Sequence, residues 1–335
     1  MQEHKNSDRK HHHIELAFQS QIENGQIDTR FYYEPLLAAH PKALSPISFL
    51  GKTMHAPIWI SSMTGGTERA GKINRHLAEA CAEFGLGMGL GSCRVLLDDD
   101  SHFDDFNLRP IIGNNYPFYA NLGIAQIEQL IEQNALAKAE DMVGKLKADG
   151  LFIHVNPLQE WLQPEGDIIK APPIDTIQAF IETTNIPVIV KEVGQGMGPE
   201  SLRALLTLPL AAIEFAAHGG TNFSKIELLR SAETRQALYG QVAHLGHSPE
   251  QMVEMANTLV YELGDMVKCR QLILSGGVKD FLTGFYLINK VTLPSVYGQG
   301  SAFLKYAQNN YADLQQYISA QIEGLKLANA YLKVK

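Results

Sequence analysis

Cysteines, long apolar runs and a surplus of basic residues are all missing or scarce in this chain of 335 residues. The three cysteines, Cys81, Cys93 and Cys269, show no CxxC spacing, so neither a disulfide framework nor a structural zinc site is expected. No apolar run approaches the roughly 18 residues that a membrane span needs. The formal net charge is −8, whereas general nucleic-acid binding needs a basic face that displaces counterions. We therefore expect neither membrane nor nucleic-acid partners.

The N-terminal segment, MQEHKNSDRKHHHIEL, lacks the apolar core of a signal peptide, which favours a cytoplasmic protein. Its cations Arg9, Lys10 and His13 cluster just before a predicted helix. Three prolines interrupt the stretch that follows. We interpret residues 1–55 as an N-terminal extension that acts as a lid over a substrate site.

Eight short apolar runs recur after this extension, and each ends in glycine or a small polar residue. They do not alternate in polarity, which is typical of strands buried on both faces. Repeated alternation of strand and helix predicts an α/β fold, a closed (β/α)8 TIM barrel that forms one domain over residues 56–335. An open doubly wound sheet is the alternative, but no GxGxxG motif follows the first run. The runs are Pro57–Ser62, Leu86–Leu90, Tyr116–Asn121, Leu151–Val155, Pro187–Lys191, Ala211–Ala216, Gln271–Ser275 and Ser295–Gly298.

Helical patterns separate the eight runs and also close the chain. The segment Phe223–Arg270 is longer than one crossover needs, so extra helices are expected there. A final amphipathic helix is predicted near Tyr306–Leu332. The other expected helices are Lys72–Phe84, Ala125–Lys147, Ile174–Thr184, Glu200–Thr207 and Asp280–Asn289.

The stretch LFIHVNPLQEWLQPEGD, residues 151–167, is where polar chemistry is most concentrated. It begins as a buried strand, turns at an Asn-Pro pair, and within seven residues supplies His154, Asn156, Gln159 and Glu160. A barrel active site has this pattern, because the strand holds the side chains still while the loop aims them. A solvated strand end is the simpler alternative.

Glycine-rich turns follow the last three predicted strands, and a lysine, Lys191, ends the fifth. Glycine allows backbone N–H groups to approach a phosphate or a flat ring closely. The loops after the seventh and eighth strands of such barrels often bind phosphate. These turns therefore predict a phosphorylated cofactor, and Lys191 is placed to stabilise negative charge on a flavin ring.

Several motifs together resemble one family, the type-2, FMN-dependent isopentenyl-diphosphate isomerases. They are RKHHH from Arg9, SMTGG (Ser62–Gly66), GSCR (Gly91–Arg94), NLG (Asn121–Gly123), HVNPLQEWLQPEGD, KEVGQG (Lys191–Gly196) and GGTN (Gly219–Asn222). The similarity extends over essentially the whole chain. It implies conversion of isopentenyl to dimethylallyl diphosphate on reduced FMN with Mg²⁺, NADPH as the reductant, and a homo-oligomer of four or eight subunits.

The resemblance also implies a role for individual residues. For FMN it implies contacts from Ser62, Met63, Thr64, Ser92, Asn121, Lys191 and Thr221, with phosphate-binding turns at Gly277, Val278, Lys279, Gly300 and Ser301. For the isoprenoid diphosphate it implies contacts from Arg9, Lys10, His13, Ser92, Cys93, Arg94, His154, Asn156 and Gln159. Glu160 matches the magnesium ligand of the family.

The sequence departs from the family pattern at three places. Ala216 stands where a serine is frequent, Cys93 replaces a glutamine, and GQGSAFL replaces an alanine-rich turn. Two other functions therefore remain open. One is a different FMN-dependent barrel, an oxidoreductase with His218 as its base, and the other is a flavin-binding protein without catalysis.

Overall fold

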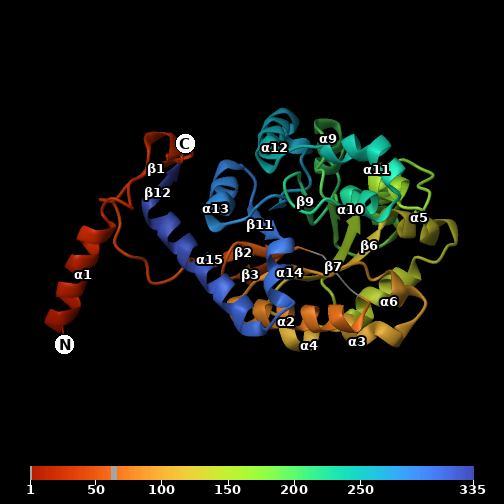
Figure 1. Ribbon diagram of the computed structural model, residues 1–335. Helices are drawn as coiled ribbons and strands as arrows, with labels where there is room; N and C mark the ends of the chain where they lie inside the picture. The colour runs from red at the N-terminus through yellow and green to blue at the C-terminus, as the bar shows by residue number, and fades with distance from the viewer. Residues whose placement is uncertain (1, 62–65) are drawn as a thin grey trace.

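The computed structural model describes residues 2–61 and 66–335, and a closed barrel of eight parallel strands forms its centre (Figure 1). Each of the eight barrel strands overlaps one of the runs predicted from sequence, so the TIM-barrel prediction is confirmed. The strands follow one another around the barrel in chain order, and β11 closes against β4. They are β4 (Ile58–Ile60), β5 (Gly87–Gly89), β6 (Phe118–Gly123), β7 (Gly150–His154), β8 (Val188–Lys191), β9 (Ala212–Glu214), β10 (Leu272–Ser275) and β11 (Ser295–Gln299).

Large side chains fill the amino-terminal end of the barrel. Trp59, Tyr119 and Phe152 meet there edge-on, with ring centroids 6.0–6.2 Å apart. The hairpin of β2 (Ile47–Phe49) and β3 (Lys52–Met54) adds the buried side chains of Phe49 and Met54 to the same cluster. Because this end is packed, a ligand can enter the barrel only at the carboxyl ends of the strands.

A ring of helices packs on the outside of the strands, in the positions that the sequence predicts. Three boundaries were predicted wrongly. The helix expected over 72–84 already begins at Glu68, because the Thr67 side chain accepts a bond from Ala70 N. The helix expected over 125–147 is broken into α5 and α6, with Asn134 between them at φ 51. The final helix begins at Tyr311 instead of Tyr306, because the Asn310 side chain accepts a bond from Asp313 N and starts a new helix. The helices covering the barrel are α2 (Glu68–Phe84), α3 (Phe103–Phe106), α4 (Arg109–Ile112), α5 (Ile124–Glu132), α6 (Ala137–Leu146), α8 (Pro173–Thr183), α9 (Pro199–Leu206), α12 (Pro249–Leu263), α13 (Phe281–Lys290), α14 (Ser301–Ala307) and α15 (Tyr311–Tyr331).

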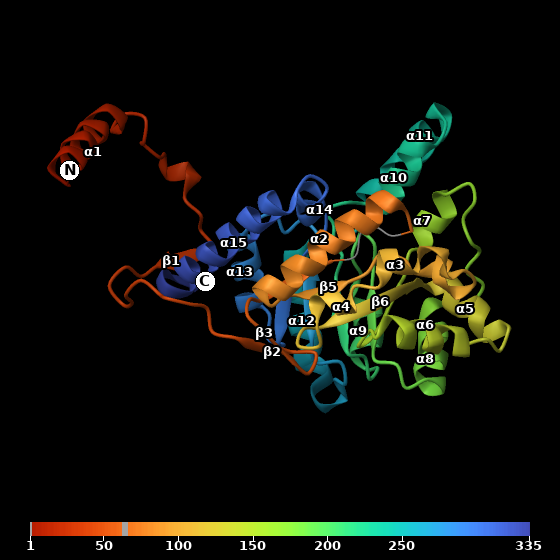
Figure 2. The same ribbon diagram turned by 90° about the horizontal axis from the view of Figure 1, so that it is seen from below.

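Three further helices lie in the loops after β7 and β9. Two of them, α10 (Phe223–Arg230) and α11 (Glu233–Tyr239), confirm the extra helices expected after residue 223, and α11 projects from the barrel in Figure 2. The third, α7 (Pro157–Leu162), lies in the loop after β7 and contacts α10. None of the helices in the described ranges is both long enough and apolar enough to cross a membrane.

The first 55 residues divide into two parts with different relations to the barrel. The β2–β3 hairpin packs beneath it, and β1 (Phe31–Tyr33) pairs with β12 (Leu332–Val334) at the chain's end. By contrast, α1 (Gln2–Leu16) stands clear of the barrel in both views (Figures 1 and 2). Of these elements, α1 is therefore the one that does not pack against the barrel, and the lid stays a prediction.

Candidate active site

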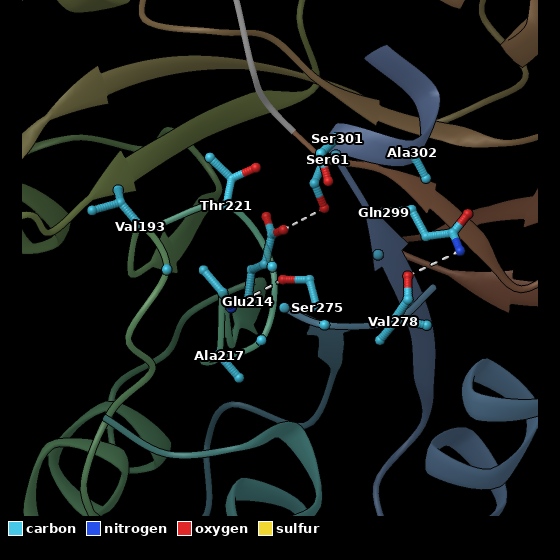
Figure 3. Close-up of a pocket in the computed structure, with 18 of the residues that line it drawn as sticks. Ser61, Val193, Glu214, Ala217, Thr221, Ser275, Val278, Gln299, Ser301 and Ala302 are labelled. Atoms are coloured by element: carbon cyan, nitrogen blue, oxygen red, sulfur yellow. Dashed lines mark hydrogen bonds between the residues drawn. The ribbon is translucent and has the colours of Figure 1, made fainter. Parts of the chain in front are cut away.

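A cavity of about 520 Å³ lies at the carboxyl ends of β8 to β11 and β4 (Figure 3). This size is within the range of small-molecule and cofactor sites. Backbone from glycine-rich turns makes up one part of its wall, and polar side chains make up another. The polar side chains include Ser61, Lys191, Glu214, Thr221, Ser275 and Gln299.

Two glycine turns pack closely at one end of the cavity. A Cβ on Gly276 would lie 2.1 Å from the Ala217 carbonyl oxygen, and one on Gly220 would lie 3.0 Å from Gly277 N. Gly276 also has φ 95, so any other residue there would be strained. Lys279 and Lys305 also line the cavity. A backbone cradle with two cations in the same cavity suits a phosphate group.

Lys191 ends β8 and is buried at the cavity wall. Its Nζ donates a 2.9 Å hydrogen bond to the Glu192 carbonyl oxygen. Burial lowers the pKa of Lys191, and the charges of Glu214 and Glu192 oppose that effect. A buried ammonium beside a phosphate cradle fits the pyrimidine edge and the phosphate of FMN, so the residues present suit that cofactor.

The cavity brings together seven of the residues that the family resemblance implied for FMN, namely Lys191, Thr221, Gly277, Val278, Lys279, Gly300 and Ser301. Two others, Ser92 and Asn121, do not line it. The remaining three, Ser62, Met63 and Thr64, lie outside the described residues.

Sequence reasoning missed five polar residues of this cavity, namely Ser61, Glu214, Ser275, Gln299 and Lys305. Ser61 donates to Glu214 Oε1 at 2.5 Å. Gln299 Nε2 donates to the Val278 carbonyl at 3.0 Å. A signal for Glu214 was present, since it is the single charge inside the apolar run AAIEFA. Such a charge in a strand buried on both faces points to a function or a partner.

A second group of polar side chains follows β7 and is held by the first turn of α7. Asn156 Nδ2 donates to Gln159 Oε1 at 3.2 Å and to Glu160 Oε1 at 2.8 Å. The other carboxylate oxygen of Glu160 accepts from Asp167 N at 2.8 Å. Both oxygens of the Glu160 carboxylate are therefore held in place by hydrogen bonds. This agrees with the expectation that the loop after this strand aims its polar side chains.

His154 lies between this loop and β6. Its Nδ1 is 2.8 Å from Asn121 Oδ1, and Asn121 Nδ2 donates to the Leu90 carbonyl at 2.9 Å. The amide oxygen is therefore the acceptor, and Nδ1 carries the proton. Burial and the charge of Lys191 lower the pKa of His154 to about 3. Nε2 of this neutral ring is thus an acceptor, and both groups of the Asn121 amide are used within the protein.

The GSCR motif places its three polar side chains differently. Arg94 is exposed, and its Nη1 forms an ion pair with Asp167 Oδ2 at 2.7 Å. Ser92 and Arg94 line one shallow hollow outside the cavity. Cys93 is buried, with its thiol on the Gly91 carbonyl and its pKa raised to about 12 by burial. Cys93 thus does not face a substrate in this structure.

Arg9, Lys10 and His13 are exposed on α1, and both views separate α1 from the strand ends that surround the cavity (Figures 1 and 2). The structure therefore does not bring these cations to the other predicted substrate residues.

Comparison with curated proteins places the chain in a family. A protein of Rickettsia felis named isopentenyl-diphosphate delta-isomerase is 32% identical over 326 residues, covering 96% of this chain and 91% of the relative. A Rickettsia typhi protein of the same name is 31% identical over 335 residues, covering 98% and 94%. The chain belongs to the isopentenyl-diphosphate delta-isomerase family. The resemblance inferred from the sequence motifs is thereby confirmed, although no family model matches the chain.

Solved structures similar to this family member have the same fold at low sequence identity. A flavocytochrome b2 double mutant with pyruvate bound has a TM-score of 0.61 and 12% identity, covering 90% of this chain and 72% of that one. A mandelate oxidase variant with an FMN adduct has a TM-score of 0.55 and 12% identity, covering 91% and 88%. At this identity the similarity concerns the barrel fold alone.

Proposed function

We propose that this protein converts isopentenyl diphosphate to dimethylallyl diphosphate, with FMN in the cavity described above and Mg²⁺ beside Glu160. The observation that carries the proposal is the nearly full-length similarity to two proteins named isopentenyl-diphosphate delta-isomerase. The cavity with its buried Lys191 and the polar loop after β7 support it independently, because a ring site and a diphosphate site then lie at the same end of the barrel.

The reaction moves a double bond without gain or loss of electrons. A proton is added at the terminal alkene carbon. Another is removed from C2, the carbon next to the one that bears the diphosphate oxygen. An alkene is a weak base, so the acid must be well positioned and the cationic transition state must be stabilised. Reduced FMN, when bound, supplies an electron-rich ring and a proton at this place. The protein must therefore hold the ring, hold the diphosphate, and fix the distance between them.

The residues around the cavity divide the task of holding the cofactor. Lys191 stabilises negative charge at the pyrimidine edge of the ring. The turns at Gly219–Gly220 and Gly276–Gly277 accommodate the phosphate, and Lys279 and Lys305 balance its charge. The family's frequent serine is Ala216 here, but Ala216 N–H donates to Ser275 Oγ at 2.9 Å, which keeps the strand end in place.

The diphosphate is bound on the other side, near the end of β7. Glu160 contributes a carboxylate to Mg²⁺, which commonly uses one or two carboxylates together with phosphate oxygens. Within the described ranges, no group of three or more His, Cys, Asp or Glu side chains is arranged to hold a metal ion. In this proposal the diphosphate supplies the other ligands of Mg²⁺. Arg94 exchanges its contact with Asp167 for a phosphate oxygen. His154 contributes as a cation only if the diphosphate raises its pKa from about 3.

We extend the proposal to the α1 segment, the assembly and the reductant. Arg9, Lys10 and His13 reach the diphosphate only if the α1 segment moves or comes from another subunit. Large apolar side chains on α1 and just after it are exposed, including Ile14 at 71% and Phe18 at 83%, which supports their burial against further copies of the chain. The family resemblance suggests a homo-oligomer of four or eight subunits. NADPH is the proposed reductant of the flavin, in a single activating step.

The decisive test separates an isomerase from an FMN-dependent oxidoreductase. We expect anaerobic enzyme, reduced once with dithionite or NADPH, to convert many equivalents of isopentenyl diphosphate without further reductant. In D₂O the new methyl group of the product should carry solvent deuterium. Consumption of one reductant per turnover would instead place the protein among the redox enzymes. Bound flavin with no turnover under either condition would indicate a flavin-binding protein without catalysis.

A further inference from the structure

Glu214 is a buried carboxylate of the cavity, and one of its oxygens has no partner among the described residues. The residue is 1% exposed at the end of β9. Its Oε1 accepts from Ser61 Oγ at 2.5 Å, as Figure 3 shows. Its Oε2 is fully buried and has no hydrogen-bond partner within residues 2–61 and 66–335. Because an unsatisfied buried carboxylate oxygen is strongly unfavourable, Oε2 points to a donor on a bound ligand.

Lys191 lies next to Glu214 and places a buried donor beside this buried acceptor. The two residues are register partners on adjacent strands, and both line the cavity. Lys191 Nζ donates to the Glu192 carbonyl, and Glu214 Oε2 has no hydrogen-bond partner among the described residues, Lys191 included. A buried donor and a buried acceptor therefore stand side by side at the cavity wall, and each has capacity left for a ligand.

We infer that Glu214 and Lys191 together recognise the imide edge of the flavin pyrimidine ring. This edge presents the C2 carbonyl next to the N3–H group, an acceptor beside a donor. Lys191 donates to the C2 carbonyl, and the free oxygen of Glu214 accepts the N3–H. The inference deepens the proposed function, because it requires FMN in the cavity, and it makes Glu214 a cofactor-binding residue.

A carboxylate at this position also affects the reduced ring. Reduced flavin carries negative charge over the pyrimidine ring, and Glu214 repels that charge while Lys191 attracts it. Replacing Glu214 by glutamine keeps the shape but removes the repulsion. The flavin midpoint potential should therefore rise in the Glu214→Gln variant, and an unchanged potential would mean that the Glu214 charge does not act on the ring.

The experiment compares FMN with 3-methyl-FMN, in which the N3–H donor is replaced by a methyl group. Flavin-free wild type and variants are titrated with each flavin by fluorescence. We expect wild type to bind FMN about 10- to 100-fold more tightly than 3-methyl-FMN, as for loss of a hydrogen bond to a charged group. Glu214→Ala should bind FMN more weakly by a similar factor and should lose the preference. Ser61→Ala is the matched control, since it removes the hydrogen bond to Glu214 Oε1 but keeps the carboxylate. This variant should still bind FMN more tightly than 3-methyl-FMN.

The outcomes separate this inference from the function on which it rests. Equal affinity of wild type for the two flavins would overturn the assignment of Glu214, and so would unchanged FMN affinity in the alanine variant. The wild-type comparison remains decisive even if the variants do not fold. A wild type that binds neither flavin would instead overturn the proposed function itself.

Discussion

His154 illustrates how burial changes the chemistry of a single residue. A histidine beside a diphosphate is easily assumed to be a cation, yet burial and the charge of Lys191 keep this ring neutral. The bond between Nδ1 and Asn121 Oδ1 then fixes which nitrogen carries the proton. The free Nε2 is an acceptor, so it repels a phosphate oxygen until the ring takes up a proton.

The lowered pKa of His154 predicts a pH dependence of folding stability. The pKa of His154 is about 3 in the folded protein and about 6.5 in the unfolded chain, so the unfolded chain binds more protons between these two pH values. The stability contribution is therefore fully present above pH 6.5 and is lost as the pH falls towards 3. At pH 5 the loss amounts to about 2 kcal/mol at most.

We expect wild type to lose more unfolding free energy than His154→Gln between pH 7 and pH 5. Urea unfolding of the flavin-free proteins at both pH values measures this difference. The His218→Gln variant, in which a different, partly buried histidine is replaced, serves as the control. Parallel losses in wild type and His154→Gln would mean that His154 titrates normally.

At the scale of one element, the loop from β7 through α7 fixes the direction of its polar groups before any ligand binds. Asn156 bonds two side chains of the next helical turn, and Asp167 N–H reaches back to Glu160. A Cβ on Gly166 would lie 1.9 Å from the Glu160 carbonyl oxygen, so only glycine allows the loop to fold back here. The loop is therefore preorganised, which reduces the cost of assembling the site when substrate binds.

Glu160→Gln tests the magnesium role of this loop. Glutamine keeps the hydrogen bond from Asp167 N but lacks the charge that attracts Mg²⁺. We expect the variant to retain bound FMN and to lose magnesium-dependent turnover by about 100-fold or more, the scale observed when one stabilising group is removed from an active site. Turnover measured against Mg²⁺ concentration checks this.

Glu165→Gln is the matched control, because Glu165 is an exposed carboxylate of the same loop and forms an ion pair with Arg230. It should keep the magnesium dependence of wild type. If Glu160→Gln retained that dependence as well, the metal would be bound elsewhere.

At the scale of the whole molecule, the cations of the N-terminal segment lie apart from the rest of the substrate site. Arg9 and Lys10 lie on α1, which stands clear of the barrel in both views (Figures 1 and 2). The pocket and the loop after β7 are complete within the barrel, so FMN binding should not depend on α1. Diphosphate binding should depend on it, because only movement or assembly brings these charges to the site.

Deletion of residues 1–10 is expected to raise the KM for isopentenyl diphosphate at least 10-fold while FMN affinity stays within twofold of wild type. Steady-state kinetics and flavin titration measure the two effects separately. Deletion of residues 2–8 is the matched control, since it shortens the same segment but keeps Arg9 and Lys10. An unchanged KM in the longer deletion would mean that the pair is only solvated surface.

The sequence by itself determined the barrel and most of the cofactor cavity. Continuous apolar runs specify strands buried on both faces, and these strands place whatever follows them at the same end of the barrel. Lys191, Thr221 and the glycine turns were therefore predictable from local patterns. The break at Asn134 and the helix start at Asn310 were not, because each depends on one residue's backbone conformation or cap.

Only the tertiary structure decided the relations between segments distant in the chain. It pairs Arg94 with Asp167, turns Asn121 towards His154, and buries Cys93 away from the site. It also joins Ser61 to Glu214, which are separated by 153 positions in the chain. Local sequence patterns specify what an element is and where it ends. Which side chains meet, and which buried oxygen lacks a partner, follows from barrel closure and packing between strands far apart in sequence.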